Sequence, residues 1–138
     1  MPAGKTARVA QSTAAHYLAK AEQFLRVARM AAEGGQHDAC MLNAIHSGIS
    51  AADAVTIARG GERSTDPDHH RAADLLERLS AGSEGARTRA RQLRMLIEKK
   101  NSVEYEGRRA SASEATQAVE RAERIVTWAR DVVTEGRV

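Results

Sequence analysis

Aromatic residues are scarce in this chain of 138 residues: they make up 3% of it, against 42% for hydrophobic residues as a whole. A core of this composition must be aliphatic and rich in alanine, and small side chains let neighbouring helices approach each other closely. The length suits one domain that buries a sizeable core. The composition therefore excludes a core organised around large rings.

Cysteine, proline and long apolar runs are also nearly absent. Cys40 is the single cysteine, which excludes an internal disulfide framework and suits a reducing compartment. The two prolines lie outside the periodic segments, so long helices run unbroken. No stretch approaches the roughly 20 apolar residues of a membrane span, and residues 1–20 lack the apolar run of a signal peptide. We therefore expect a soluble, cytoplasmic protein without membrane contact.

Charge is unevenly distributed, although the net charge is only +3. Positions 87–109 hold eight basic residues and three glutamates, which gives this window a charge of +5. A basic zone on a nearly neutral body can attract a polyanion. The alternative interpretation is a solvated helix face with no ligand.

Apolar residues recur at spacings of three and four in five segments, which predicts five helices. The first follows Ser12 or Thr13 and ends at Gly34-Gly35, the second runs from 38 to 61, the third covers roughly 67–80, the fourth starts at Ser83 and the fifth follows Ser111. No segment alternates convincingly at period two, so strands are not expected.

Helices joined by short turns favour an all-α fold, an antiparallel up-and-down bundle of about five helices. We expect residues 1–11 to form a flexible N-terminal arm and residues 12–138 to form a single domain that contains the bundle.

Residues that favour helix starts support these boundaries. Asp38 is a candidate N-cap for the second helix, and Asp66-Pro67 reads as an N-cap followed by a proline in the first helical position. Ser111 with Glu114 three residues later matches a capping box.

The end of the fourth segment reads IEKKNSVEYEG, residues 97–107. Lys100 and Glu104 are four residues apart, and so are Asn101 and Tyr105, so each pair shares a face if the helix continues. One interpretation is a surface ion pair worth a few tenths of a kcal/mol beside a tyrosine packed on the bundle. The other is a group of residues that handles phosphate.

The order of these segments resembles the HEPN domains of prokaryotes. The likeness rests on LRMLIEKKNSVEYEG, followed by SASEATQAVERAERIVTWARDVV, and on AIHSGISAADAV with GERSTDPDHHRAADLL, and it covers roughly residues 12–135. The signature of that family is an Arg, commonly followed by Asn or Asp, with a His four to six residues later at a helix end. Lys100-Asn101 stands where Arg-Asn would be, and Tyr105 stands where the His would be.

The resemblance implies a homodimer whose two motifs face each other across a cleft and act on RNA or hold a nucleotide-like ligand. Many relatives are toxins or defence components, often paired with a nucleotidyltransferase-type antitoxin. Lysine keeps the charge of arginine but loses its planar fork. A phenol with an ordinary pKa of about 10 is a poor general base at neutral pH. These departures favour phosphate binding over metal-independent RNA cleavage.

Polar residues on the second helix form a candidate wall of the same site. Asn43, His46, Ser50 and Asp53 fall at spacings of three, four and three, beside the apolar arc. His46 would replace the missing base in space, although not in sequence. The alternative is a polar border that is hydrogen-bonded to its neighbours.

The sequence thus predicts Lys100, Tyr105 and His46 as catalytic residues, and Asn101, Asp53, Ser50 and Arg94 as residues that contact the substrate. No cofactor and no metal site are expected, because the adjacent His69 and His70 point about 100° apart on a helix and only one cysteine is present.

Two other functions remain open on the sequence alone. One is a non-catalytic helical module that regulates or binds a partner, such as a nucleotidyltransferase-type protein. The other is a structural bundle that dimerises through the last helix.

Overall fold

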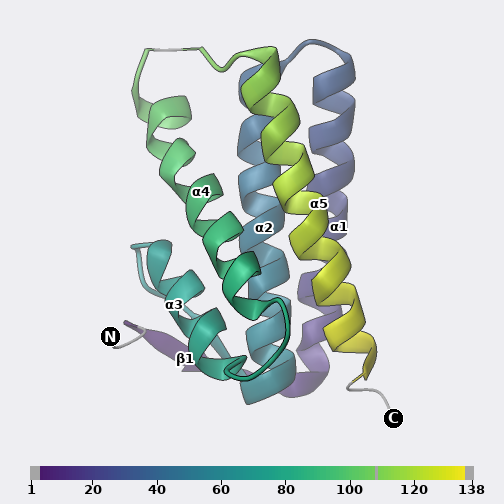
Figure 1. Ribbon diagram of the computed structural model, residues 1–138, viewed down its shortest axis with the longest axis vertical. Helices are drawn as coiled ribbons and strands as arrows, with labels where there is room; N and C mark the ends of the chain where they lie inside the picture. Colours follow the sequence, from purple (N-terminus) through teal and green to yellow (C-terminus); the bar gives the residue numbers. More distant parts are fainter. Residues whose placement is uncertain (1–3, 108, 136–138) are drawn as a thin grey trace.

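Five α-helices and one small sheet make up the computed structural model, which describes residues 4–107 and 109–135. Figure 1 shows the four long helices side by side, with consecutive ones running in opposite directions. The predicted all-α fold is confirmed. The elements are β1 (Thr6–Arg8), the 3-10 turn η1 (Gln11–Thr13), α1 (Ala14–Glu33), α2 (His37–Gly60), β2 (Glu62–Ser64), α3 (His70–Leu79), α4 (Ala86–Tyr105) and α5 (Ala112–Glu135).

Helix α2 lies at the centre of the bundle, and it contacts α1, α3, α4 and α5. It is buried on nearly every side, from Cys40 to Ile57. Small residues allow this packing: a Cβ on Gly48 would lie 2.8 Å from Leu96 Cδ1 of α4, too close for a side chain. The alanine-rich, aliphatic core that the composition predicts is confirmed, and Cys40 is buried in it.

The short antiparallel sheet corrects the prediction that the chain has no strands. Thr6 pairs with Ser64 and Arg8 with Glu62, so β1 lies against β2 just after α2. The Val9 amide also donates to the Gly61 carbonyl at 2.8 Å. Three-residue strands are too short to show a period of two, and their pairing spans more than 50 residues. Within the predicted arm, Thr6–Arg8 form β1 and Gln11 begins η1, whereas residues 1–3 lie outside the described residues.

Two predicted N-caps are wrong and the capping box is confirmed. Helix α2 begins before Asp38, whose carboxylate instead accepts the Ala110 amide at 2.7 Å, far along the chain. Helix α3 begins at His70 rather than at 67. At the start of α5, the Ser111 amide donates to Glu114 Oε1 at 3.0 Å, and the Glu114 amide donates to Ser111 Oγ at 3.1 Å.

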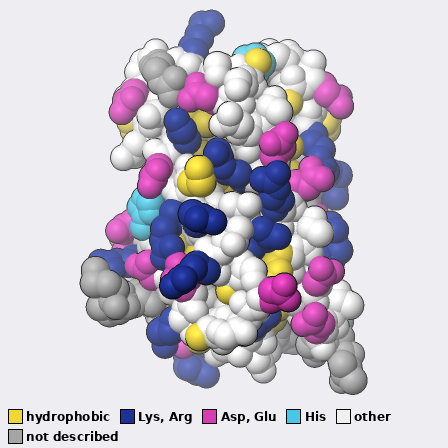
Figure 2. Space-filling model, viewed as in Figure 1, with side chains coloured by type: hydrophobic (Ala, Val, Ile, Leu, Met, Phe, Trp, Pro, Cys, Tyr) yellow, Lys and Arg dark blue, Asp and Glu magenta, His cyan; other side chains and the backbone are white. Residues whose placement is uncertain are grey.

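Basic side chains gather on one face of the bundle. Figure 2, viewed as Figure 1, shows Lys and Arg grouped over α4 and the adjoining part of α5, with acidic groups toward the rim. Within the described parts of the chain, no helix is both long and apolar enough to span a bilayer.

Candidate functional site

Lys100 and Glu104 continue the core-facing row of α4. The buried residues Ala90, Leu93 and Ile97 recur at spacings of three and four, and the same spacing next reaches positions 100 and 104. Lys100 Nζ lies 2.6 Å from Glu104 Oε2, and the two side chains are only 18% and 22% exposed. The ion pair that the sequence predicts is therefore present, with Lys100 half-buried and Glu104 at the exposed end of the helix.

A cavity of about 520 Å³ opens beside this pair, between the start of α3 and the end of α4. Lys100, Asn101 and Tyr105 line it from α4, so three of the residues predicted from the sequence share one hollow. The Lys100 ammonium lies 6.0 Å from the centre of the Tyr105 ring, and Tyr105 is 76% exposed. The other lining residues are Pro67, Asp68, His69, His70, Ile97 and Glu98.

His69 is the residue that the sequence analysis missed as a member of this site. It precedes α3 and lines the cavity opposite Lys100. Burial lowers the pKa of His69, and the positive charge of Lys100 lowers it further. Its imidazole is therefore largely neutral at pH 7 and can accept a proton. Sequence spacing places His69 near the start of the third helix and does not connect it with Lys100, because 31 residues separate the two.

His46 lies close to the same charges but is not among the residues that line the cavity. Its ring packs against Phe24 of α1, with 5.7 Å between the ring centres. Burial lowers the pKa of His46, and Lys100 lowers it further while Glu104 opposes this effect. His46 thus shares the electrostatic environment of the cavity from a position on α2.

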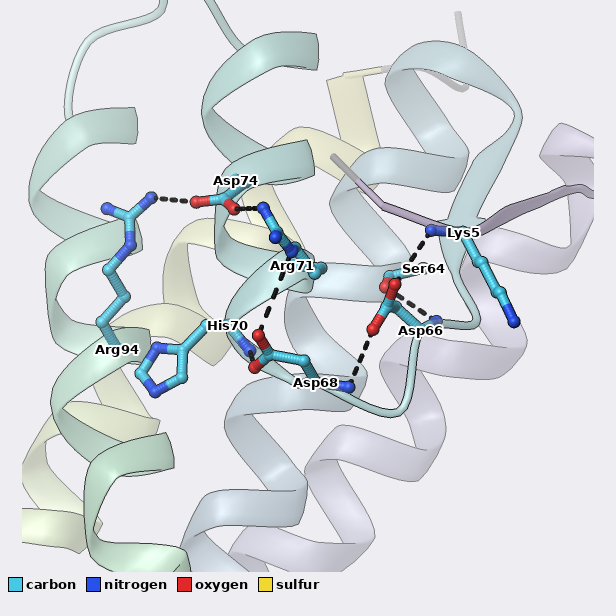
Figure 3. A network of polar contacts seen from close by, with 8 residues as sticks. All are labelled: Lys5, Ser64, Asp66, Asp68, His70, Arg71, Asp74 and Arg94. Atoms are coloured by element: carbon cyan, nitrogen blue, oxygen red, sulfur yellow. Dashed lines mark hydrogen bonds and ion pairs between the residues drawn. The ribbon is translucent and has the colours of Figure 1, made fainter. Parts of the chain in front are cut away.

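Hydrogen bonds fix the turn that leads into α3 (Figure 3). Asp66 Oδ2 accepts the Lys5 amide at 3.1 Å and Asp66 Oδ1 accepts the Asp68 amide at 2.9 Å. Asp68 Oδ1 in turn accepts the His70 amide at 3.0 Å. These backbone donors lower the pKa of Asp66, so the turn keeps its charge and its shape in mildly acidic solution.

Arg94 bridges α3 and α4 by binding two carboxylates of α3. Its guanidinium contacts Asp74 at 2.9 Å and also contacts Glu77 (Figure 3 shows the Asp74 contact). The Arg94 guanidinium is thus bound to groups within the protein, about two turns before Lys100 along α4. Arg94 does not line the cavity.

Asp53 and Ser50 are buried on α2, away from the residues that line the cavity. Asp53 lies 4.0 Å from Arg63 of β2, and that guanidinium stands 5.5 Å from the centre of the Tyr17 ring. Burial raises the pKa of Asp53 to about 7, while Arg63 and Lys20 oppose this effect. The predicted polar wall on α2 therefore divides: its first part approaches the cavity and its second part lies under the small sheet.

Metal ligands are not grouped in the described parts of the chain. Among residues 4–107 and 109–135, no three side chains of His, Cys, Asp or Glu are placed to hold one ion. The chemistry that these residues can support is that of a cation, a neutral imidazole, an amide and a phenol around one hollow.

The HEPN domain family matches residues 14–132, from the first residue of α1 to near the end of α5. This match covers most of the chain. The chain belongs to the HEPN family. No curated protein matches the sequence. The whole cavity, from Pro67 to Tyr105, lies inside the HEPN match.

Proposed function

We propose that this HEPN protein binds RNA through a backbone phosphate in the cavity between α3 and α4, and cleaves it without a metal ion. The observation that carries the proposal is the shared hollow of Lys100 and His69, a cation and a proton acceptor. Because Tyr105 stands where the family has a histidine, the sequence motif by itself lacks a general base for cleavage. His69 supplies the missing base from the turn before α3.

Lys100 is the group that neutralises phosphate. Its ammonium is bound to Glu104, and this hydrogen bond is the largest cause of the lowered pKa of Glu104. A phosphate that enters the cavity competes with Glu104 for Lys100, so Glu104 sets how tightly an anion binds. Asn101 and Tyr105 line the mouth and donate hydrogen bonds to phosphate oxygens or to a base.

The reaction is an attack of a ribose hydroxyl on the adjacent phosphorus. His69 accepts the 2′-hydroxyl proton while the 2′-oxygen bonds to phosphorus. The bond from phosphorus to the 5′-oxygen breaks, and that oxygen takes a proton from water. The products are a 2′,3′-cyclic phosphate and a 5′-hydroxyl end. Lys100 stabilises the extra negative charge on the pentacoordinate phosphorus.

The other predicted site residues take supporting roles in this proposal. His46 packs on Phe24 and stays uncharged beside Lys100, whose positive charge lowers the pKa of His46. Arg94 holds α3 against α4 and thereby fixes the width of the cavity. Ser50 and Asp53 keep the packing of α2 beneath the sheet.

A second copy of the chain completes the site in this proposal. Tyr105 is 76% exposed at the mouth of the cavity, so a partner protomer can cover it and contribute its own motif to a common cleft. We further propose a cytoplasmic toxin or defence role with a cognate antitoxin, for which a nucleotidyltransferase-type protein is the candidate partner. Both follow from membership of the family rather than from this site.

Incubation with mixed RNA in EDTA tests the proposal. We expect cleavage that ends in cyclic phosphates, and Lys100→Ala should reduce kcat/KM by roughly 10²–10³-fold because it removes the charge that faces the phosphorus. Lys99→Ala is the matched control, since Lys99 binds Glu114 of α5 instead. Equal amounts of intact RNA with wild type and Lys100→Ala would reject catalysis by Lys100.

The base is assigned by a second set of variants. His69→Ala should lower kcat/KM by at least about 10²-fold, while the exposed His16→Ala should leave it unchanged. Because His69 must be neutral, kcat/KM should rise with pH, and the midpoint of the rise should lie below the ordinary histidine pKa of about 6.5, in line with the lowered pKa of His69. A larger loss with His46→Ala than with His69→Ala would transfer the role to His46.

A non-catalytic interaction module is the second candidate function. It is favoured by the Lys100–Glu104 ion pair, because the Lys100 ammonium is already bound to a carboxylate within the protein. Glu104→Gln separates the two functions. If the protein cleaves RNA, Glu104→Gln frees Lys100 and inorganic phosphate should bind more tightly to the variant than to wild type. If the protein is a module without an anion site, neither wild type nor Glu104→Gln should bind inorganic phosphate.

A further inference from the structure

Four arginines on the front of the bundle lack a partner among the described residues. Arg87 and Arg91 lie on α4, and Arg121 and Arg124 lie on α5; we call them the α4–α5 arginine face. None of them makes a hydrogen bond or ion pair with another described residue. Figure 2 shows the basic side chains grouped over these two helices.

Most arginines elsewhere in the bundle are neutralised. Arg29 binds Glu123, Arg130 binds Glu22, and Arg78 binds Glu62. Arg94, on the α3 side of α4, binds two carboxylates. Arg8, Arg26, Arg59, Arg89 and Arg109 also have no ion pair among the described residues, but only the α4–α5 arginine face gathers four such arginines on two adjacent helices. Such a concentration favours a polyanionic ligand.

Helix geometry arranges these arginines in two rows. Arg87 and Arg91 are one turn apart on α4, about 6 Å along the axis, and Arg121 and Arg124 are three residues apart on α5. The Lys99–Glu114 ion pair, at 3.4 Å, shows that α4 and α5 face each other along this seam. Arg87 also lines a hollow beside Glu77 of α3, so Arg91, Arg121 and Arg124 are the guanidinium groups that an extended phosphate backbone can contact across the two helices.

A cavity of about 430 Å³ adjoins the same face. Arg89, Arg124 and the ring of Trp128 line it, together with the carboxylates of Glu120, Glu123 and Asp131. The carboxylates repel phosphate but accept hydrogen bonds from the amino groups of a nucleobase. The aromatic ring offers a stacking surface for such a base. The hollow is therefore suited to an unpaired base and the arginines to the backbone that carries it.

We propose that the α4–α5 arginine face binds the backbone of single-stranded RNA, with one unpaired base in the cavity beside Trp128. The inference rests on the proposed function in taking RNA as the ligand, but it concerns a different surface from the cavity of Lys100. Duplex RNA fits less well, because its bases are already stacked and paired. The face would position a strand for the site at the other side of α4.

Fluorescence anisotropy with a labelled single-stranded oligoribonucleotide tests the proposal on the full chain. We expect Arg91→Gln/Arg124→Gln to weaken binding about tenfold near 0.1 M salt. It should also reduce the slope of log K against log salt by about 1.4, since each phosphate contact on a single strand contributes about 0.7. The control is Arg8→Gln/Arg26→Gln, which removes the same charge from exposed positions on β1 and α1. Circular dichroism confirms the fold of both variants.

A second arm tests the base. Trp128→Leu should weaken binding to single-stranded RNA with little change in the salt slope, because stacking releases no counterions. Duplex RNA that binds as tightly as the single strand would overturn the assignment. So would equal losses in the face variant and in its control.

The two proposals fail in different ways. If Lys100→Ala abolishes cleavage while Arg91→Gln/Arg124→Gln binds like wild type, the face is overturned and the cavity proposal stands. If wild type binds RNA through the face without cleaving it, the face stands and the proposed reaction falls. If wild type binds no RNA even at low salt, both are overturned.

Discussion

The two halves of this bundle are held together by different interactions. Helices α1, α2 and α5 meet through alanine and aliphatic side chains, with Ala21, Ala44 and Ala129 fully buried, and the two ion pairs between α1 and α5 lie at the exposed rim. Between α3 and α4, the Arg94 bridge adds charged contacts to the apolar stripe, and the Lys100–Glu104 pair lies within α4 itself. The cavity that holds Lys100 and His69 lies in this second half.

The difference separates the part of the bundle that contributes most to stability from the part that holds the candidate site. Close packing stabilises strongly but leaves no room for a ligand. Polar contacts contribute less, since a partly exposed ion pair is worth about 1 kcal/mol or less. They do, however, leave charged groups and a cavity that a ligand can use. Substitutions in the two halves should therefore affect different measurements, and a series of variants can test this.

The largest effect is expected in the apolar stripe of α4. Leu93→Ala should lower the free energy of unfolding by about 2–5 kcal/mol, because Leu93 is fully buried and its loss leaves a cavity. Met95→Ala, two residues away on the exposed side of the same helix, should change it by about 0.5 kcal/mol at most. Urea unfolding measures both, and similar values for the two would contradict the assignment of the stripe.

The next effect depends on pH and concerns Asp53. Burial raises its pKa from 3.8 to about 7, so the folded protein holds a proton that the unfolded chain releases. The contribution of Asp53 to stability is thus complete below about pH 4 and is lost as the pH rises through 7. Three pKa units correspond to about 4 kcal/mol. Asn cannot ionise, so Asp53→Asn should gain up to about that much over wild type between pH 4 and pH 8.

Urea unfolding of both proteins at pH 4, 6 and 8 measures this difference. His46 and His69, whose lowered pKa values make stability fall with acidification below about 6.5, are present in both proteins and cancel. Asp131→Asn, the same substitution at an exposed position on α5, is the control. A constant offset between wild type and Asp53→Asn would show that Asp53 is ionised throughout.

A smaller effect is expected where α2 and α4 approach most closely. Gly48→Ala places a Cβ 2.8 Å from Leu96 Cδ1, and the strain of about 1–3 kcal/mol exceeds the gain in helix propensity of about 1 kcal/mol. We expect a net loss of about 1 kcal/mol in thermal or urea unfolding. Gly34→Ala is the contrasting variant, because its nearest atom is 3.6 Å away and its φ is −85°. A stabilised Gly48→Ala protein would mean that Leu96 moves freely.

The smallest effect on stability is expected at the site itself. Lys100→Met should change the free energy of unfolding by about 0.5 kcal/mol or less, because an i,i+4 pair at a helix end contributes little. The same substitution should remove RNA cleavage. A loss of several kcal/mol would instead make Lys100 a structural residue and would support the non-catalytic module.

The helices could be predicted from the sequence because their signals are local. Apolar spacing identified the stripes of α1, α4 and α5, and the pairing of Ser111 with Glu114 placed the start of α5. The pairing of β1 with β2 could not be predicted, since it joins polar residues more than 50 positions apart. Asp38 was mistaken for an N-cap because the same side chain can equally serve a distant backbone amide.

The candidate site could be predicted only in part for the same reason. Lys100, Asn101 and Tyr105 lie within one turn and a half of a helix, and they line one cavity. His69 joins them only through the packing of α3 on α4. The inward direction of Lys100 was present in the spacing of Ala90, Leu93 and Ile97, but a lysine on a core stripe is ordinarily assigned to the surface.

The close contact at Gly48 has a practical consequence for redesign. It fixes α4 against α2 through Leu93 and Leu96, below the first charged position of the site. Figure 1 shows α4 diverging from α2 toward its C-terminal end. The residues of α4 from Lys100 onward can therefore be substituted while Leu93 and Leu96 keep the helix packed against α2. Libraries randomised at these positions should yield folded proteins with new anion preferences.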